Sequence, residues 1–439
     1  MFVGREHEIN KINKRYRDML GGKGSVLFIS GEAGLGKTTL VHEWSKTIVN
    51  DGAVFAESAC SIPIAGMQVG LIEALQPWAD VVSGLQSEEH AEKKKIDIRK
   101  LIHDSAPAWA WALPLVGDLA HAAFETSRLI HDQRIEASRN PNASNQEQVF
   151  QQYVNLLSKI AEEHPLVILL DDAHWADTSS VNLLFYLSRQ IKEKRVLVLV
   201  TYRPDDAAMA HNGEGHSILK VKSEMIRYET GAELALSYMD GAAIRTILGT
   251  MFPGYEHKEG VDEFERWLAK ISDGNSLFIT QFLSTLHEDG HLTAKGKFTG
   301  DYNTVAIPTS VLAVVEERTR RLNKDLRDLL SYATAEGEEF TTYVLSKLGN
   351  REPLKLLHEL RDATQKHVIV EKGRSRSFAN QTTTVFGFSH ALFHKVLYDQ
   401  LMEEEKAILH RQCYEILRAE WQNAEEKGQH PASLASKLL

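Results

Sequence analysis

The chain has 439 residues, a net charge of −10 and 43% hydrophobic residues, which predicts about three globular domains with sizeable cores. The acidic balance disfavours a general polyanion-binding surface, although a local basic patch would still allow nucleic-acid binding. Cys60 and Cys413 lie far apart without metal-ligand spacing, so no disulfide framework is expected. Without a secretory leader or an apolar stretch of membrane-spanning length, a cytoplasmic location and no membrane partner are expected.

A helix is the first predicted element. Residues 2–6 open it, and Ile9, Ile12 and Tyr16 recur within it at spacings of three and four. A helix in this place either covers the adenine side of a nucleotide or simply caps a sheet, and spacing alone does not separate these roles. A buried strand over residues 26–29 is predicted next.

The segment GEAGLGKTT follows this strand and fits the pattern G-x-x-x-x-G-K-[ST] of a phosphate-binding loop, or P-loop. Its glycines let backbone N–H groups close around phosphate oxygens, and the helix that follows adds positive charge at its N-terminus. We expect Lys37 to reach the outer phosphates and Thr38 to bind Mg²⁺. The predicted nucleotide contacts are Gly31, Glu32, Ala33, Gly34, Leu35, Gly36, Lys37, Thr38 and Thr39.

Two later buried strands are predicted, over residues 166–170 and 196–200, and each ends in charged residues. We expect Asp171 to hold Mg²⁺, directly or through water, and Asp172 to orient or deprotonate the water that attacks the γ-phosphate. Arg203 is expected to contact the γ-phosphate and report its loss, with a surface salt bridge as its alternative role. The alternation of strands and helices predicts a doubly wound α/β domain with a parallel sheet.

The remainder of the chain is predicted to be mainly helical. Residues 287–291 read HEDGH and satisfy the zinc-protease pattern H-E-x-x-H. Asp289 and Gly290 are expected to end the helix between the two histidines, so zinc is not expected. Further on, helices that end in a hairpin near residues 368–370 and 385–388 predict a winged helix.

Winged helices often read DNA grooves, so DNA binding is an alternative for this region. The helix before the hairpin mixes Lys355 and Arg361 with Glu359 and Asp362. It therefore shows no basic face, and nucleic acid is not the expected partner.

Four motifs together resemble the STAND class, the AAA-related signal-transduction ATPases with numerous domains. They are residues 2–6, the P-loop, residues 169–177 (LLDDAHWAD) and residues 201–203 (TYR). The extension Trp175-Ala176-Asp177 resembles the branch of bacterial regulators of the maltose-activator type. The resemblance implies a P-loop domain over 1–208, a helical lid over 209–304, a winged helix over 305–400 and the start of a helical repeat arm over 401–439.

The resemblance also implies a function and additional site residues. The function is that of a slowly hydrolysing ATPase switch that uses ATP, ADP and Mg²⁺, closed with ADP and oligomeric, or bound to a partner protein, once activated. The additional nucleotide contacts are Val3, Gly4, Arg5, Ser276, which replaces the proline of the family's lid motif, and His390, which is expected to approach the bound diphosphate. A DNA-associated ATPase that resembles origin initiators, and a non-hydrolysing scaffold with a structural nucleotide, are the alternative functions.

Overall fold

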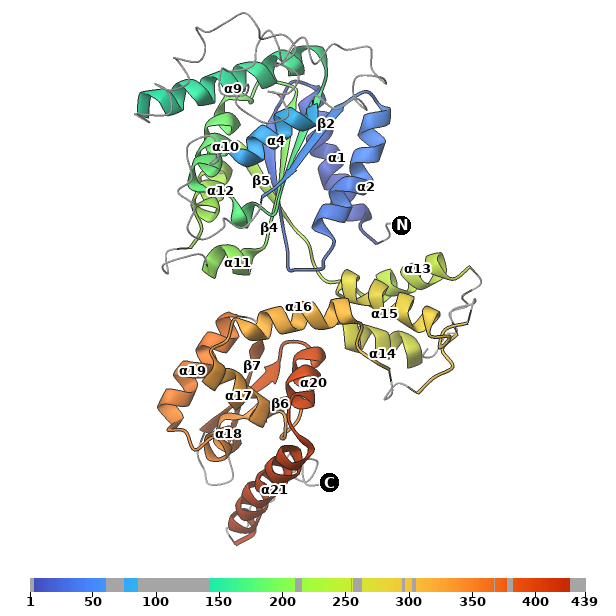
Figure 1. The fold of residues 1–439 in the computed structure, drawn as a ribbon, viewed down its shortest axis with the longest axis vertical. Helices are drawn as coiled ribbons and strands as arrows, with labels where there is room; N and C mark the ends of the chain where they lie inside the picture. The colour runs from blue at the N-terminus through green and yellow to red at the C-terminus, as the bar shows by residue number, and fades with distance from the viewer. Residues whose placement is uncertain are drawn as a thin grey trace, which may run out of the picture. The chain divides into compact units, whose positions relative to one another are not determined.

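The computed structural model forms two compact units, Met1–Ser237 and Tyr238–Leu439 (Figure 1). In the described part of the chain no helix is long and apolar enough to cross a membrane. The structure describes residues 4–60, 75–85, 143–209, 215–253, 255, 263–293, 297–301, 305–366, 368–376 and 382–426.

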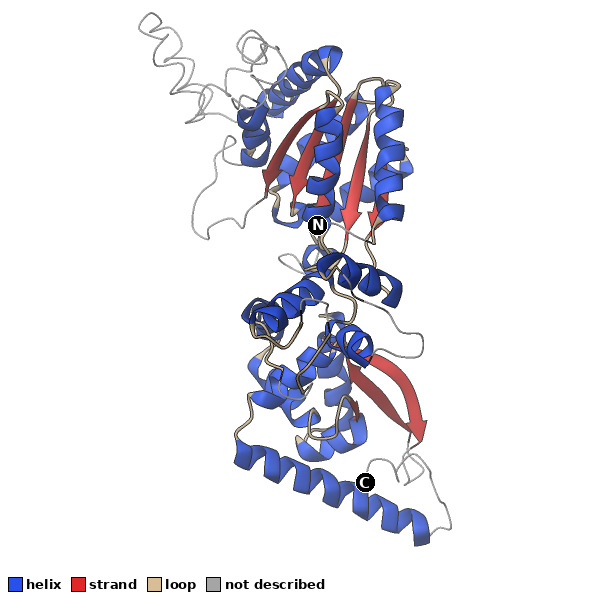
Figure 2. Cartoon of the chain, turned by 90° about the vertical axis from the view of Figure 1, so that its right-hand side faces the viewer, coloured by secondary structure: helices blue, strands red, loops and turns tan. Residues whose placement is uncertain are grey.

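The first unit is built on a parallel sheet with strand order β2-β3-β4-β1-β5 (Figure 1). Its central strands are apolar because helices cover both faces of the sheet (Figure 2). The predicted parallel α/β fold is therefore confirmed. The strands are β1 (Ser25–Ser30), β2 (Val54–Ala59), β3 (Leu166–Asp171), β4 (Val196–Tyr202) and β5 (Gly231–Ala235).

Alternating side chains of the sheet form two separate cores. Leu27 and Ile29 of β1 belong to the core under α1 and α2, whereas Val26 and Phe28 belong to the core on the opposite face, under α4, α9, α10 and α12. The parallel strands therefore end at one common edge between two helical layers. The helices are α1 (Glu6–Leu20), α2 (Lys37–Asn50), α4 (Gln76–Leu85), α9 (Ala143–Glu163), α10 (Thr178–Gln190) and α12 (Ser217–Arg227).

Two short helices lie directly after strands at this edge. The 3₁₀ helix η2 (Ala173–Trp175) follows β3, and α11 (Pro204–Met209) follows β4. Neither has enough residues to show a hydrophobic period, and the sequence did not predict them. The edge strand β5 pairs with β1 in register Val26–Gly231 to Ser30–Ala235 and lies beyond the domain boundary expected at residue 208.

The second unit begins with three helices, α13 (Gly241–Met251), α14 (Glu263–Ser272) and α15 (Ser276–Glu288). Asn275 caps α15 by accepting hydrogen bonds from the N–H groups of Leu277 and Phe278. The helix ends at Glu288, as predicted, and Gly290 follows with φ of 73°. The two histidines of the HEDGH segment therefore do not share a helical face, which a zinc-protease site requires.

The rest of the second unit combines helices with a small antiparallel sheet of order β6-β8-β7 (Figure 2). The hairpin β7–β8 was predicted, but the three-residue strand β6 was not. The elements are α16 (Thr309–Arg320), α17 (Lys324–Ala333), β6 (Glu339–Thr341), α18 (Thr342–Leu348), α19 (Pro353–Gln365), β7 (Ile369–Arg376), β8 (Thr382–Phe388), α20 (Ala391–Asp399) and α21 (Glu403–Glu426).

Candidate nucleotide-binding site

The P-loop connects β1 to the first turn of α2 at the carboxyl edge of the sheet. Gly34 and Gly36 both have φ of 83°, in the left-handed region that favours glycine. A side chain at Gly31 would be tightly packed, because an added Cβ would lie 3.2 Å from a methyl carbon of Leu35 and 3.3 Å from Cβ of Leu236. The path of this loop thus favours glycine at positions 34 and 36.

Lys37 is the first residue of α2 and folds back along the loop. Its Nζ donates hydrogen bonds to the carbonyl oxygens of Gly31 at 2.8 Å and Glu32 at 3.1 Å. Burial, assisted by the charge of Arg203 and opposed by Asp172 and Asp171, lowers the pKa of Lys37 to about 8. The amine is therefore held at the loop, and a negatively charged ligand would stabilise its charged form.

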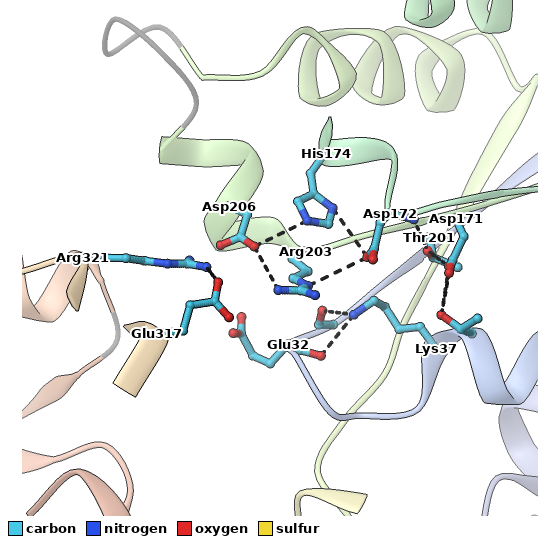
Figure 3. Close-up of polar contacts among 12 residues, drawn as sticks. Glu32, Lys37, Asp171, Asp172, His174, Thr201, Arg203, Asp206, Glu317 and Arg321 are labelled. Atoms are coloured by element: carbon cyan, nitrogen blue, oxygen red, sulfur yellow. Dashed lines mark hydrogen bonds and ion pairs between the residues drawn. The ribbon is translucent and has the colours of Figure 1, made fainter. Parts of the chain in front are cut away.

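Thr38 and Asp171 come from elements 133 residues apart and meet directly. The Thr38 hydroxyl donates to Asp171, 2.9 Å from Oδ1 and 2.8 Å from Oδ2. Thr201, near the end of β4, also donates its hydroxyl to Oδ1 and accepts a 2.9 Å hydrogen bond from the backbone N–H of Asp172 (Figure 3). Two threonine hydroxyls, one from the first turn of α2 and one from β4, thereby fix the direction of the carboxylate at the end of β3.

This donor set fits Mg²⁺ bound together with a nucleotide. A hydroxyl has one proton and two lone pairs, so Thr38 can donate to Asp171 and still offer a lone pair to a metal. Mg²⁺ usually takes one or two protein oxygens and completes its shell with phosphate and water. Within the described ranges no group of three or more His, Cys, Asp or Glu residues could hold a metal by itself.

Asp172, Arg203, His174 and Asp206 form a loose ring beside this site (Figure 3). Nε of Arg203 and Nδ1 of His174 each lie 3.8 Å from Oδ1 of Asp172. On the other side of the ring, Nη1 of Arg203 and Nε2 of His174 each lie 3.4 Å from Oδ2 of Asp206. Asp172 itself has φ of 52°, a backbone strain often found at functional positions.

Arg5 reaches the P-loop from the residue preceding α1. One end of its guanidinium donates to the carbonyl of Leu35 at 3.3 Å, and the other pairs with Glu8 at 2.9 Å. Only 3% of Arg5 is exposed, and Gly4 before it has φ of 77°. The structure therefore brings Arg5 to the loop, with Gly4 directly before it in the chain, whereas Val3 lies outside the described residues.

The remaining predicted residues divide between the two units. Glu32, Ala33 and Gly34 are half-buried in the P-loop, and Thr39 is exposed on α2. Ser276 is the first residue of α15 in the second unit, where it is half-buried.

His390 also belongs to the second unit. It caps α20 by accepting a 3.0 Å hydrogen bond at Nδ1 from the Leu392 N–H, and its ring packs edge-on against Phe278 at 5.3 Å. Burial lowers its pKa, partly opposed by the backbone of Ser272 and by Asp273.

Three polar residues of the site were not predicted: Thr201, His174 and Asp206. Thr201 and His174 lie within motifs that carried the family resemblance, but the sequence assigned them no role. Their positions in the sequence could have indicated a role, because Thr201 lies near the end of one buried strand and His174 shortly after the end of another. Asp206 lies in α11, and its approach to His174 depends on how that short helix packs.

The fold and the site define a P-loop nucleotide-binding domain, with phosphate and metal ligands at the carboxyl edge of a parallel sheet. Residues 1–200 match the family model described as an AAA ATPase domain. The chain is also 24% identical over 420 residues to an uncharacterized protein of Rhizobium meliloti, a match that covers 94% of this chain and 36% of that protein. The chain thus spans about a third of the length of this relative.

Two solved structures are similar over much of the chain. The Signal Transduction ATPase with Numerous Domains (STAND) protein with a tetratricopeptide repeat sensor from Pyrococcus horikoshii is 17% identical, with a TM-score of 0.33, over 100% of this chain and 48% of that one. The ORC1 protein of Aeropyrum pernix, solved in complex with DNA, is 12% identical, with a TM-score of 0.42, over 93% of this chain and 95% of that one. TM-scores this low carry no argument, so the assignment of a P-loop nucleotide-binding domain rests on the strand order, the site and the AAA ATPase match.

Proposed function

We propose that this protein is an ATP-binding, slowly hydrolysing signal-transduction switch of the STAND type. The observation that carries the proposal is the meeting of Thr38 with Asp171 at 2.8 to 2.9 Å, one residue from a lysine bound to the P-loop. This arrangement supports the proposal, because it groups a lysine amine, a hydroxyl and a carboxylate beside a P-loop, as the binding of phosphates and Mg²⁺ requires.

In this proposal the P-loop backbone and Lys37 hold the phosphates, while Thr38 and Asp171 hold Mg²⁺. The metal, when bound, would neutralise charge on the β- and γ-phosphates. Asp172 accepts a hydrogen bond from the attacking water, orients it and takes up its proton. Arg203 moves from its carboxylate partners to the γ-phosphate and returns when that phosphate is lost.

The conformational part of the proposal comes from the resemblance to STAND ATPases. ADP favours a closed arrangement and ATP an open one that self-associates, which requires the two states to differ in nucleotide affinity. His390 and Ser276 supply the nucleotide contacts from the second unit. The AAA ATPase match supports the nucleotide-binding core of this switch.

The domain assignment is part of the same proposal. Because β5 pairs with β1, we end the nucleotide-binding domain at Ser237 and begin the lid with α13. The order α17, β6, α18, α19, β7 and β8 supports the winged helix, since it places a helix pair before a hairpin. Helix α21 would begin a repeat arm, and residues 427–439 lie outside the described part of the chain.

Binding is tested by titrating the full chain with ATP, with and without Mg²⁺. We expect Mg²⁺ to tighten ATP binding in the wild type but not in Thr38→Ala, which loses the metal-binding hydroxyl. Thr47→Ala is the matched control, because Thr47 is exposed on the same helix and hydrogen-bonds only locally, to the Trp44 carbonyl, in the described contacts. Equal Mg²⁺ dependence in both variants would contradict the proposed metal site.

Hydrolysis is tested by phosphate release from the wild type and from Asp172→Asn. We expect this substitution to slow turnover on the order of a hundredfold while ATP still binds, because the amide cannot accept a proton from water as a carboxylate does. Unchanged turnover would argue instead for the scaffold, whose nucleotide is structural.

A further inference from the structure

His174 is the most buried polar side chain of the loose ring, with no exposed side-chain surface. In the described structure neither ring nitrogen has a hydrogen-bond partner, although carboxylate oxygens lie 3.8 Å from Nδ1 and 3.4 Å from Nε2. Buried polar groups are normally hydrogen-bonded, and leaving one unpaired costs on the order of 1 to 3 kcal/mol. An imidazole kept unpaired between two acids therefore requires an explanation.

The ring offers His174 two acceptors for one proton. Burial lowers the pKa of His174 to about 4, although Asp206 acts to raise it, so the imidazole is neutral near pH 7. A neutral imidazole has a single N–H, while ionised carboxylates only accept. His174 can therefore donate to Asp172 through Nδ1 or to Asp206 through Nε2, but not to both.

Arg203 lies between the same two carboxylates on the other side of the ring. Its Nη1 hydrogen-bonds Asp206 at 3.4 Å, and its Nε lies 3.8 Å from Asp172. If Arg203 moves to a γ-phosphate, Asp172 loses this neighbour at the moment when it must hold the attacking water. Catalytic hydrogen bonds that are long without substrate often shorten in the substrate complex.

We propose that His174 is a positioning residue that donates its Nδ1 proton to Asp172 when ATP is bound and so orients that carboxylate for the attacking water. The inference rests on the proposed ATPase function and deepens it. Asp206 is the alternative acceptor, and it couples the orientation of Asp172 to α11, the helix that follows Arg203.

Two substitutions separate this role from simple packing. An asparagine amide ends where Nδ1 lies in histidine, whereas a glutamine amide ends near the position of Nε2. His174→Asn can therefore still donate to Asp172, while His174→Gln can donate only toward Asp206. We expect His174→Gln to lower kcat ten- to a hundredfold with little change in KM for ATP, and His174→Asn to retain most of the wild-type kcat.

The controls use the same full-length chain. His216→Gln removes a neighbouring half-buried histidine that contacts the Ala176 carbonyl at 2.8 Å, and it should leave kcat within about threefold, as expected for a packing change alone. Because His174 acts through Asp172, adding His174→Gln to Asp172→Asn should cause no further loss of kcat.

The outcomes distinguish this inference from the function on which it rests. Equal losses of kcat in His174→Asn and His174→Gln, or additive losses with Asp172→Asn, would overturn the positioning role and leave the ATPase proposal intact. A wild-type chain that binds ATP but releases no phosphate would overturn the hydrolytic function and this inference together.

Discussion

Lys37 combines two properties that a phosphate-binding lysine needs. It is 6% exposed, and its amine is already held by two loop carbonyls, so little side-chain entropy remains to be lost on binding. Burial also lowers its pKa to about 8, which makes its charge sensitive to mildly alkaline pH. A bound triphosphate would favour the charged amine and raise that pKa.

ATP affinity should therefore fall as pH rises through the pKa of Lys37. Below about pH 8 the free protein carries the charged amine; above it, binding must first recover a proton, so Kd should increase toward about tenfold per pH unit. Titrations between about pH 7.5 and about pH 9.5 test this. Lys37→Arg is the control, since arginine stays charged in this range, and a parallel rise in its Kd would point to another group.

Removing the amine should have a larger effect than shifting its charge. Lys37→Ala is expected to weaken ATP binding on the order of a hundredfold, the effect of losing charge-assisted hydrogen bonds. Lys46→Ala is the matched control, because Lys46 is exposed on the same helix and pairs only with Glu43 in the described contacts. Calorimetric titration with ATP compares the two, and similar affinities would show that the lysine does not reach the phosphates.

At the residue scale, motif chemistry predicted the contacts that belong to a P-loop and to a strand end. The Thr38–Asp171 pair follows from the rule that parallel strands end at a common edge. The bond from Arg5 to Leu35 and the approach of His174 to Asp206 depend on how short segments pack. No period or spacing of the sequence encodes that packing.

Among the elements, α15 is flanked by two glycines with the same left-handed backbone conformation. Gly274 and Gly290 both have φ of 73°, but their surroundings differ. A Cβ on Gly274 would lie 2.2 Å from the carbonyl oxygen of Met239, which is a steric clash. A Cβ on Gly290 would meet nothing within 4 Å. The segment before α13 thus lies directly against the N-terminal end of α15, where only glycine leaves room for it.

This pair separates backbone strain from steric overlap. Gly290→Ala should cost about 1 to 2 kcal/mol, the penalty of the left-handed conformation alone. Gly274→Ala adds displacement of the Met239 backbone and should cost about 3 kcal/mol or more. Hydrogen–deuterium exchange of residues 276–288 measures the local opening of α15. Equal exchange in the two variants would mean that Met239 yields without cost.

At the element scale, long periodic segments were predictable and short ones were not. The buried strands of the sheet and the hairpin β7–β8 had clear apolar patterns. Strand β6 has three residues, too few for an apolar pattern, and is defined by its pairing with β8, from Glu339–Gly387 to Thr341–Val385. Helix α11 has only six residues, too few for a hydrophobic period that would predict it from the sequence.

For the whole molecule, the proposed switch requires the second unit to influence nucleotide release. His390→Ala should speed ADP dissociation roughly fivefold or more if this histidine contacts the diphosphate. His390→Asn is the informative companion, because asparagine preserves an N-cap for α20 but removes the imidazole. Stopped-flow displacement of a fluorescent ADP analogue measures both. Normal release from His390→Asn would assign His390 to capping only.

The nucleotide that co-purifies with the chain provides a second test at this scale. We expect ADP in the resting protein and a larger assembly after exchange for ATP, measured by light scattering. An unchanged mass with either nucleotide, in a chain that binds both, would remove self-association from the proposal. A Lys37→Ala chain should show neither nucleotide nor any change in mass.

In the proposed function, the hydroxyl groups around Asp171 influence which form of the nucleotide would bind. Thr201 donates its hydroxyl proton to Asp171 and accepts a hydrogen bond from the N–H of Asp172. Thr38 donates its only hydroxyl proton to the same carboxylate. Thr38 therefore presents lone pairs to anything that enters beside it, and the bare oxygens of a metal-free triphosphate would be repelled there. If the proposed function is correct, the direction of this one proton would favour the magnesium complex over the free anion.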